Sequence, residues 1–270
     1  MRAFWILAAE AFRDGLRRRL ALVVGVALVL GLASAQSCTQ IGVGEIRMNG
    51  QSVDPVMVAG FVAPLLFAFQ ALTVLAIAGL VAADHLARPL AEGNAVLWLA
   101  RPVSRDAWAA ARLAGALAIA LAAGAVLLGG TGAMLVLRQG VAPGPVLAAA
   151  GATALGALVI ASLAMAASLA LGRSAVVLGV LLGLALVVAA NSFGLAVDLV
   201  HPEVEVGGFL ASIDRYGPPL FTAIAAAVAE WNPHIAPGGT YASAMLRLAL
   251  WAAAGIASLL ALFRRREIEA

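Results

Sequence analysis

The stretch that decides the fold is residues 146–197, VLAAAGATALGALVIASLAMAASLALGRSAVVLGVLLGLALVVAANSFGLAV. It consists of two apolar runs, residues 146–171 and 175–197, with only Gly-Arg-Ser between them. A helix needs about 20 mainly apolar residues to cross the hydrocarbon core of a bilayer, and each run is that long. Because the connection is so short, the stretch predicts two membrane-spanning helices in a tight antiparallel hairpin.

The rest of the chain has the same character. Of its 270 residues, 63% are hydrophobic and 11% are charged, whereas an average soluble domain is about half apolar and a quarter charged. The mean hydropathy is +1.02. We therefore expect an all-α membrane protein that forms a single transmembrane domain over residues 1–270. Its six predicted spans are residues 20–35, 57–83, 113–137, 146–171, 175–197 and 245–263.

The arginines predict the orientation of these spans. An even number of spans places both termini on one side, and basic residues accumulate on the cytoplasmic side. With cytoplasmic termini, thirteen of the 17 arginines lie inside. Arg47, Arg138 and Arg215 then lie outside, and Arg247 lies near the outer end of the last span. This asymmetry accounts for the pI of about 10.0 without a nucleic-acid partner.

A basic segment precedes the first predicted span. Its apolar and charged residues recur at helical spacing on opposite faces, so we expect an amphipathic helix on the inner leaflet. The apolar face comprises Trp5, Ala8, Phe12 and Leu16, and the charged face comprises Glu10, Arg13, Asp14 and Arg17. A cleavable secretory signal is the rival interpretation, because three arginines and an apolar run lead to Ala33-Ser34-Ala35. The long amphipathic segment before the run favours the membrane-surface helix.

The outer segment before the last span, residues 198–244, changes in composition along its length. After an acidic first half, Pro218-Pro219 opens an apolar run over residues 220–230, which is too short to span a bilayer. Such a run predicts a short helix that lies at the interface or re-enters from the outer face. An outer cap with no role in transport is an equally good interpretation.

The link between the second and third spans, residues 84–112, contains a short apolar run at residues 95–100. The run is too short for a span and too apolar for a solvated loop. It predicts a short cytoplasmic helix that docks in a partner's groove, with Leu97 and Trp98 as anchors and charged residues at the rim. A helix that lies in the inner leaflet is the other interpretation.

Residues 92–105, EGNAVLWLARPVSR, resemble the coupling-helix region of type-2 ABC-transporter permeases. In that family an acidic residue and Gly-Thr precede a Leu-Leu pair and then Pro-hydrophobic-Ser-Arg. This chain departs from the pattern at Asn94 and Trp98. The layout is also similar, with an N-terminal amphipathic helix, six spans, an outer helical hairpin before the last span and a basic C-terminal end. Within the family, the chain looks closer to general exporters and copper-enzyme maturation systems.

The resemblance implies a permease of a bacterial cytoplasmic (inner) membrane that works as a dimer with two separate ATPase subunits. ATP and Mg²⁺ would bind on those subunits, and this chain would bind no cofactor and catalyse no reaction. Closure of the ATPase subunits would move the coupling helix and the N-terminal helix, through Phe12, Arg13, Asp14 and Leu16. The ATPase-docking residues would be Glu92, Gly93, Leu97, Trp98, Arg101, Pro102, Ser104 and Arg105.

Several chemistries are excluded by residue types alone. All 17 basic residues are arginines, so the chain has neither the lysine of a phosphate-binding loop nor that of a Schiff-base enzyme. The single cysteine, Cys38, and the scattered His85, His201 and His234 predict no metal site. An intramembrane hydrolase or transferase would need a nucleophile and a base at matching depth, and no predicted span contains histidine.

Two amide side chains and one arginine lie within the predicted spans and are candidates for function. Gln70 either bridges two helices or faces a substrate path, and Asn191 lies late in the fifth span. Arg247 can extend outward, with Asp198 or Glu230 as candidate partners. A second function is mechanotransmission without transport, in which an extracytoplasmic protein binds an outer segment and receives the ATP-driven movement. The sequence does not separate the two functions.

Overall fold

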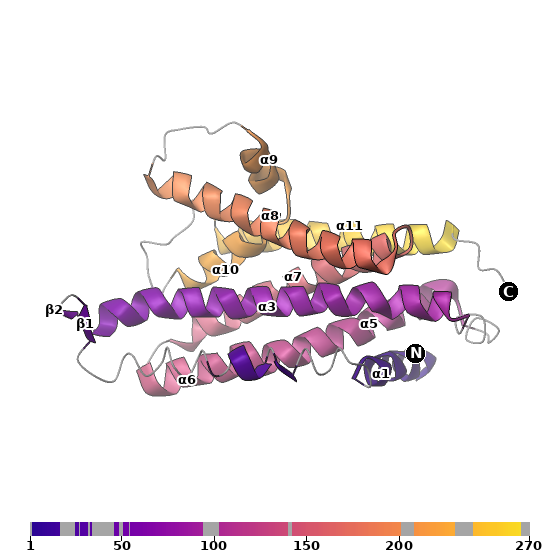
Figure 1. The fold of residues 1–270 in the computed structure, drawn as a ribbon, viewed down its shortest axis with the longest axis horizontal. Coiled ribbons are helices and arrows are strands. Elements are labelled where there is room, and N and C mark those ends of the chain that lie inside the picture. Colours follow the sequence, from indigo (N-terminus) through magenta and orange to yellow (C-terminus); the bar gives the residue numbers. More distant parts are fainter. Residues whose placement is uncertain are drawn as a thin grey trace.

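A computed structural model describes the fold of this chain. The described residues are 2–16, 25–26, 28–31, 33, 46–48, 51–53, 55–93, 103–139, 142–200, 208–229 and 240–265. The long helices are α3 (Pro55–Ala91), α5 (Arg105–Gly124), α7 (Pro143–Ser168), α8 (Arg173–Val200) and α11 (Tyr241–Arg265). Figure 1 shows them as a bundle of roughly parallel and antiparallel rods.

The remaining elements are short. Helix α1 (Arg2–Leu16) precedes the bundle, and a π-helical turn, η2 (Ala125–Gly129), joins α5 to α6 (Gly130–Gln139). Two short helices lie in the described part of the chain between α8 and α11, namely α9 (Phe209–Tyr216) and α10 (Leu220–Val228). The strands β1 (Ile46–Met48) and β2 (Gln51–Val53) form one antiparallel hairpin. The helical fold class is confirmed for the described residues, apart from this hairpin.

Five helical segments among the described residues are long and apolar enough to cross a membrane. They are residues 65–91, 105–137, 143–168, 173–197 and 241–265. Each corresponds to one predicted span, and their lengths and composition are those of a multi-pass membrane protein. The predicted span at residues 20–35 falls largely outside the described residues.

The helices continue beyond the ends of the predicted spans. Helix α3 runs on past residue 83 to Ala91, and α5 already begins at Arg105, so that only residues 92–104 connect them. Hydropathy marks where the apolar composition stops. A helix can continue beyond its apolar run where tertiary contacts cover its polar side chains. This is the case here, because His85 of α3 and Arg112 of α5 are both buried. The predicted link at residues 84–112 is therefore partly helical.

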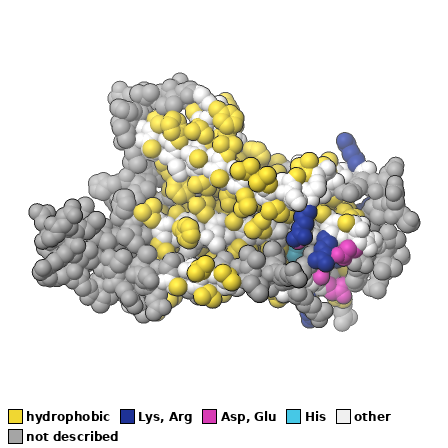
Figure 2. All heavy atoms as spheres, viewed as in Figure 1, with side chains coloured by type: hydrophobic (Ala, Val, Ile, Leu, Met, Phe, Trp, Pro, Cys, Tyr) yellow, Lys and Arg dark blue, Asp and Glu magenta, His cyan; other side chains and the backbone are white. Residues whose placement is uncertain are grey.

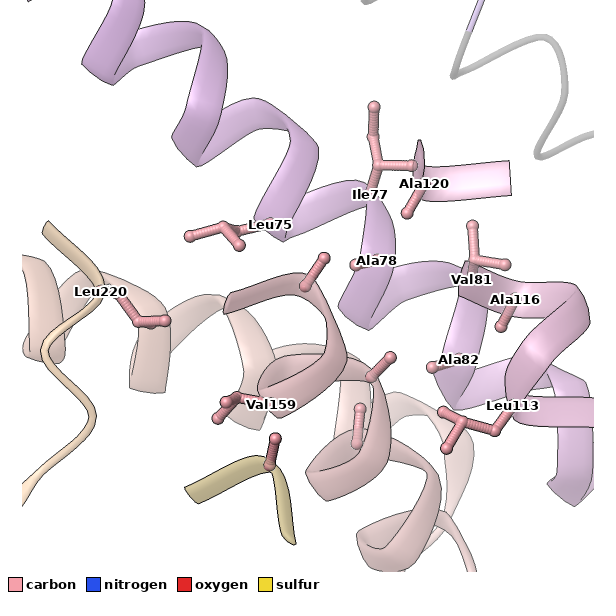
Figure 3. Close-up of a cluster of buried hydrophobic side chains, with 14 of the residues drawn as sticks. Leu75, Ile77, Ala78, Val81, Ala82, Leu113, Ala116, Ala120, Val159 and Leu220 are labelled. Atoms are coloured by element: carbon pink, nitrogen blue, oxygen red, sulfur yellow. The ribbon is translucent and has the colours of Figure 1, made fainter. Parts of the chain in front are cut away.

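Helix α3 lies at the centre of the bundle and packs against α5, α7 and α8. Figure 3 shows small and branched side chains of α3 interleaved with those of α5, α7 and α10, among them Val159 and Leu220. A Cβ added to Gly79 of α3 would lie 2.4 Å from the Val180 Cγ1 atom of α8, so only glycine permits this approach. Close packing through small residues is the usual way in which membrane helices associate.

Charged side chains gather at one end of the bundle (Figure 2). Helix α1, the end of α3, the start of α5, the turn between α7 and α8, and the end of α11 gather at one end (Figure 1). Figure 2 shows blue and magenta side chains at this end and an apolar surface over the middle. We call it the arginine-rich end. The arginines at this end whose side chains are described are Arg13, Arg88, Arg105, Arg112, Arg173, Arg264 and Arg265.

Candidate functional site

The first part of the motif at residues 92–105 ends helix α3. Gly93 has a φ of +72°, a left-handed conformation that favours glycine and commonly terminates helices. The backbone N–H of Glu92 donates to the carbonyl of Arg88 at 2.9 Å, and the Glu92 carboxylate pairs with the Arg88 guanidinium at 2.5 Å. Glu92 and Gly93 therefore have a structural role in closing the last turn of α3.

The last part of the motif starts helix α5. Ser104 has extended backbone angles, and its hydroxyl accepts a hydrogen bond from the backbone N–H of Ala107 at 3.2 Å. This is the geometry of a helix N-cap. Arg105 is the first residue of α5, and Asp106 places an acidic group in the first turn, where the helix dipole favours it. Leu97, Trp98, Arg101 and Pro102 lie outside the described residues.

Helix α1 packs directly on α5 rather than lying only on a lipid surface. Ala11 is fully buried in this contact. A Cβ added to Gly115 would lie 2.5 Å from the Ala11 Cβ atom and 3.0 Å from the backbone nitrogen of Phe12. The two helices therefore meet almost backbone to backbone. The predicted apolar face is divided: Trp5 and Leu16 are exposed, whereas Ala8 is buried and Phe12 packs partly buried against the core.

His85 joins α3 to the same helix. It is buried, and its Nε2 atom lies 3.1 Å from the Ala11 carbonyl oxygen of α1. Its Nδ1 atom lies 2.9 Å from the carbonyl oxygen of Val81, one turn earlier in α3. A histidine that the sequence leaves without a role is thus a contact between α1 and the end of α3.

A line of charged and aromatic groups runs from α1 through α5 to α11. Asp14 of α1 pairs with Arg112 of α5 at 3.3 Å. The guanidinium carbon of Arg112 lies 5.3 Å from the centre of the Trp108 ring, within cation–π range. Trp108 in turn stacks on Phe263 of α11, with ring centres 5.6 Å apart. We call Asp14, Arg112, Trp108 and Phe263 the α1–α5–α11 strap.

Two further ion pairs join helices at the arginine-rich end. Arg264 near the end of α11 binds the Asp106 carboxylate at the start of α5, and its Nε atom donates to both carboxylate oxygens at 2.9 and 3.0 Å. Arg173 at the start of α8 pairs with the buried Asp84 of α3 at 2.6 Å. Both sides of the link at residues 92–104 are therefore connected by charge to other helices.

Gln70 and Asn191 both bridge helices. The Gln70 side-chain nitrogen donates to the Gly31 carbonyl at 3.2 Å, while its Oε1 atom is buried and has no hydrogen-bond partner among the described residues. Asn191 of α8 donates to the Asp214 carboxylate of α9 at 2.7 Å and accepts from the backbone N–H of Phe221 of α10 at 3.1 Å. The bridging interpretation of Gln70 is the one that the described contacts favour.

Arg247 of α11 binds the C-terminal end of α9. One of its guanidinium nitrogens donates to the carbonyl oxygens of Asp214, Arg215 and Gly217, at 2.7, 2.9 and 2.9 Å. A cation is favoured there, because the last carbonyls of a helix are unpaired and carry the negative end of its dipole. The side chains of the two candidate partners named from the sequence, Asp198 and Glu230, lie outside the described residues.

The sequence indicated few of the contacts that hold the arginine-rich end together. The sequence assigns no partner to Arg173, Asp106, Arg264 or Trp108. The only available signal was their position at helix ends, where many charges have no partner. In the described part of the chain, no group of three or more potential metal ligands is present.

The close approach of α1 to α5 predicts opposite effects for two matched substitutions. Gly115→Ala is expected to lower the stability by about 1–3 kcal/mol, because the new methyl group would overlap Ala11 and the α1 backbone. Gly124→Ala makes the same change in the same helix, where the nearest atom is an ordinary 3.5 Å away. It should gain about 0.5–1 kcal/mol from helix propensity. Unfolding in mixed micelles with increasing SDS measures both, and equal effects would contradict the close packing.

Comparison with known proteins does not assign the chain to a family. No protein-family model matches its sequence. No curated protein matches it either.

Proposed function

We propose that this chain is the membrane-spanning permease subunit of an ABC transporter of the exporting kind, driven by a separate ATPase subunit that docks at residues 92–105. The observation that supports this most is the set of connections around the link between α3 and α5. On one side of the link, Asp84 and His85 join α3 to α8 and α1. On the other side, Asp106 and Arg112 join α5 to α11 and α1.

These connections suit a link that receives mechanical force from a partner and passes it to the helices. A push on the link would move the adjoining ends of α3 and α5, and the ion pairs and the α1–α5–α11 strap would carry that movement to three further helices. Coupling over such distances needs packed, hydrogen-bonded elements with two arrangements. The nucleotide state of the ATPase would then select between the arrangements through its different affinity for each.

A sixth span and cytoplasmic termini belong to the same proposal. Helix α1 lies at the arginine-rich end, whereas α3 begins at the opposite end, so the chain between them has to connect the two ends (Figure 1). The described residues 28–31 are helical, and Gly31 accepts a hydrogen bond from Gln70. A span at residues 20–35 fits both observations. The positive-inside rule then places the arginine-rich end in the cytoplasm, at a bacterial inner membrane.

A second copy of the chain completes the proposed transporter. Helix α8 is the least buried of the five candidate spans among the described residues. Leu178, Leu181 and Leu182 are exposed on it, and no described atom lies within 4 Å of a Cβ added to Gly179 or Gly183. Such a surface suits close helix packing between two copies.

Docking of the ATPase is tested by placing charge in the apolar run of the link. Leu97→Asp combined with Trp98→Asp is expected to abolish co-purification with the ATPase subunit, because a carboxylate is costly to bury in an apolar groove. Affinity purification from native membranes, mass spectrometry for a subunit with a phosphate-binding loop, and vanadate-sensitive ATP hydrolysis measure the result.

The matched control is Leu171→Asp, an exposed leucine in the turn between α7 and α8 at the same end of the bundle. It should leave both co-purification and ATP hydrolysis intact. Retention of the ATPase by the double variant would contradict the docking site. Loss of the ATPase from both variants would show that any acidic substitution at this end disturbs the assembly, which also contradicts a site confined to the link.

Mechanotransmission to an extracytoplasmic partner is the second candidate function. It is favoured by the attachment of α9 and α10 to α8 and α11 through Asn191 and Arg247, since movement of these two long helices would then displace the hairpin on the far side. In purified proteoliposomes that hold only the permease and the ATPase, a transporter moves its substrate. A mechanotransmitter hydrolyses ATP there without moving any solute.

A further inference from the structure

Helix α9 exposes its two aromatic residues, Phe209 and Tyr216. Phe209, Ile213 and Tyr216 recur at a spacing of four and three residues and therefore share one face. Phe209 is 70% exposed and Tyr216 is 71% exposed, and none of the eight residues of α9, all of them described, is fully buried. The acidic Asp214 lies on the other side, against α8. We call Phe209, Ile213 and Tyr216 the outward face of α9.

This orientation is held by specific contacts. Asn191 of α8 donates to the Asp214 carboxylate at 2.7 Å, and Arg247 of α11 binds three carbonyls at the end of α9. Gly194 allows α9 to come close to α8, because an added Cβ would lie 2.3 Å from the Asp214 Oδ2 atom. We call these contacts the α9 clamp. Since the clamp fixes both the position and the rotation of α9, the tertiary contacts of the fold determine that the outward face is exposed.

The depth of the clamp can be measured along two independent helices. Asn191 lies 18 residues after Arg173, the first residue of α8, and Arg247 lies 18 residues before Arg265, the last residue of α11. At 1.5 Å per residue, both distances from the arginine-rich end are about 27 Å. The hydrocarbon core of a bilayer is about 30 Å thick. The two helices therefore agree that α9 lies at the boundary of the hydrocarbon core farther from the arginine-rich end.

From these observations we infer that α9 is a membrane-surface anchor, and that lipid of the leaflet farther from the arginine-rich end covers its outward face. Short amphipathic helices with aromatic residues lie in this way at the boundary between headgroups and acyl chains. Phe209 suits the acyl side. Tyr216 suits the boundary itself, where its ring is apolar and its hydroxyl is hydrated. Arg215, whose guanidinium carbon lies 5.8 Å from the centre of the Tyr216 ring, can reach the headgroups.

The anchor does not depend on an ATPase partner, so it goes beyond the proposed function and its test is independent. Because the clamp ties α9 to α8 and α11, any tilt of these two helices would carry the anchor with it. The anchor would thus fix the position of the bundle relative to the far leaflet, and the arginine-rich end would fix its position relative to the near leaflet.

The test uses single cysteines in the full-length chain with Cys38→Ser. Phe209→Cys and Tyr216→Cys are each labelled with the environment-sensitive fluorophore NBD and reconstituted into phosphatidylcholine nanodiscs, with and without bromine on the acyl chains. Ala91→Cys, an exposed site at the end of α3 and seven residues beyond the Asp84 that pairs with Arg173, is the control outside the hydrocarbon core at the arginine-rich end. We expect blue-shifted emission at positions 209 and 216, with bromine quenching at least three-fold stronger than at position 91.

Two results would overturn the inference. Water-like emission with quenching no stronger than at position 91 would show that lipid does not cover the face. Blue-shifted emission in native membranes that is lost in pure-lipid nanodiscs would show that a protein covers it instead. A further variant tests the clamp: Gly194→Leu should displace Asp214 and lower the bromine quenching at position 209 by half or more. Unchanged quenching there would show that the clamp does not orient α9.

Discussion

Trp108→Ala is expected to lower the free energy of unfolding by about 3–5 kcal/mol, the usual cost of truncating a large buried aromatic residue. Trp108 is almost fully buried, stacks on Phe263 and lies beneath the Arg112 guanidinium, so its removal would open a cavity at the centre of the α1–α5–α11 strap. Its indole nitrogen has no hydrogen-bond partner among the described residues, and the expected loss is therefore one of packing. Unfolding with SDS in mixed micelles, followed by circular dichroism, measures it.

Two variants separate packing in the strap from a general effect of losing tryptophan. Trp108→Phe keeps a ring against Phe263 and removes an unpaired N–H group, so it should cost less than about 1.5 kcal/mol. Trp5→Ala removes an exposed tryptophan from the outward side of α1 and should change the stability by no more than about 0.5 kcal/mol. A Trp108→Ala variant as stable as Trp5→Ala would mean that α5 and α11 do not depend on this contact.

Asn191→Leu is expected to cost about 2–4 kcal/mol, although the two side chains have the same branched arrangement of heavy atoms. The substitution removes the amide donor to the Asp214 carboxylate and the acceptor for the backbone N–H of Phe221. Phe221 is the second residue of α10, where a backbone N–H has no partner within its own helix. A buried polar group that loses its partner costs about 1–3 kcal/mol, and more if it is charged.

The control for Asn191→Leu is Ala196→Leu, which adds a leucine to an exposed position of the same helix. It should leave the SDS unfolding midpoint unchanged. The NBD label at position 216 gives a local measurement, because release of α9 and α10 should change its emission before the bundle unfolds. A single transition, identical by circular dichroism and by the label in both variants, would contradict the role of Asn191 in holding the two short helices.

These contacts lie at two levels of the bundle. At the arginine-rich end, ion pairs and the strap connect the flanks of the α3–α5 link to three other helices. Farther along α8 and α11, one asparagine and one arginine hold a helical hairpin against these two helices. Both sets of contacts join helices that are distant in sequence, with Arg264 and Asp106 separated by 158 positions. The bundle between them is apolar and closely packed, so displacement at one end has a continuous path to the other.

The location of the motif at residues 92–105 could be predicted from the sequence, but the roles of its residues could be predicted only in part. Its outer residues proved to be helix terminators: Gly93 ends α3 with a left-handed residue, and Ser104 caps α5. Either role can be read locally, since glycine at helix ends and serine at helix starts are general preferences. The anchors proposed for the ATPase, Leu97 and Trp98, lie outside the described residues, and their role remains a prediction.

What the sequence by itself determined is the membrane-spanning character, the positions of the long helices and the uneven distribution of arginine. Each is a local property, because a run of about 20 apolar residues is stable as a helix in a bilayer whichever helix it packs against. Only the tertiary structure decided the partners of the polar side chains: Ala11 for His85, Asp214 for Asn191, and the carbonyls of α9 for Arg247. Such partners depend on the register and rotation of one helix against another. Many close-packed small residues set that register together, and no single segment of the sequence encodes it.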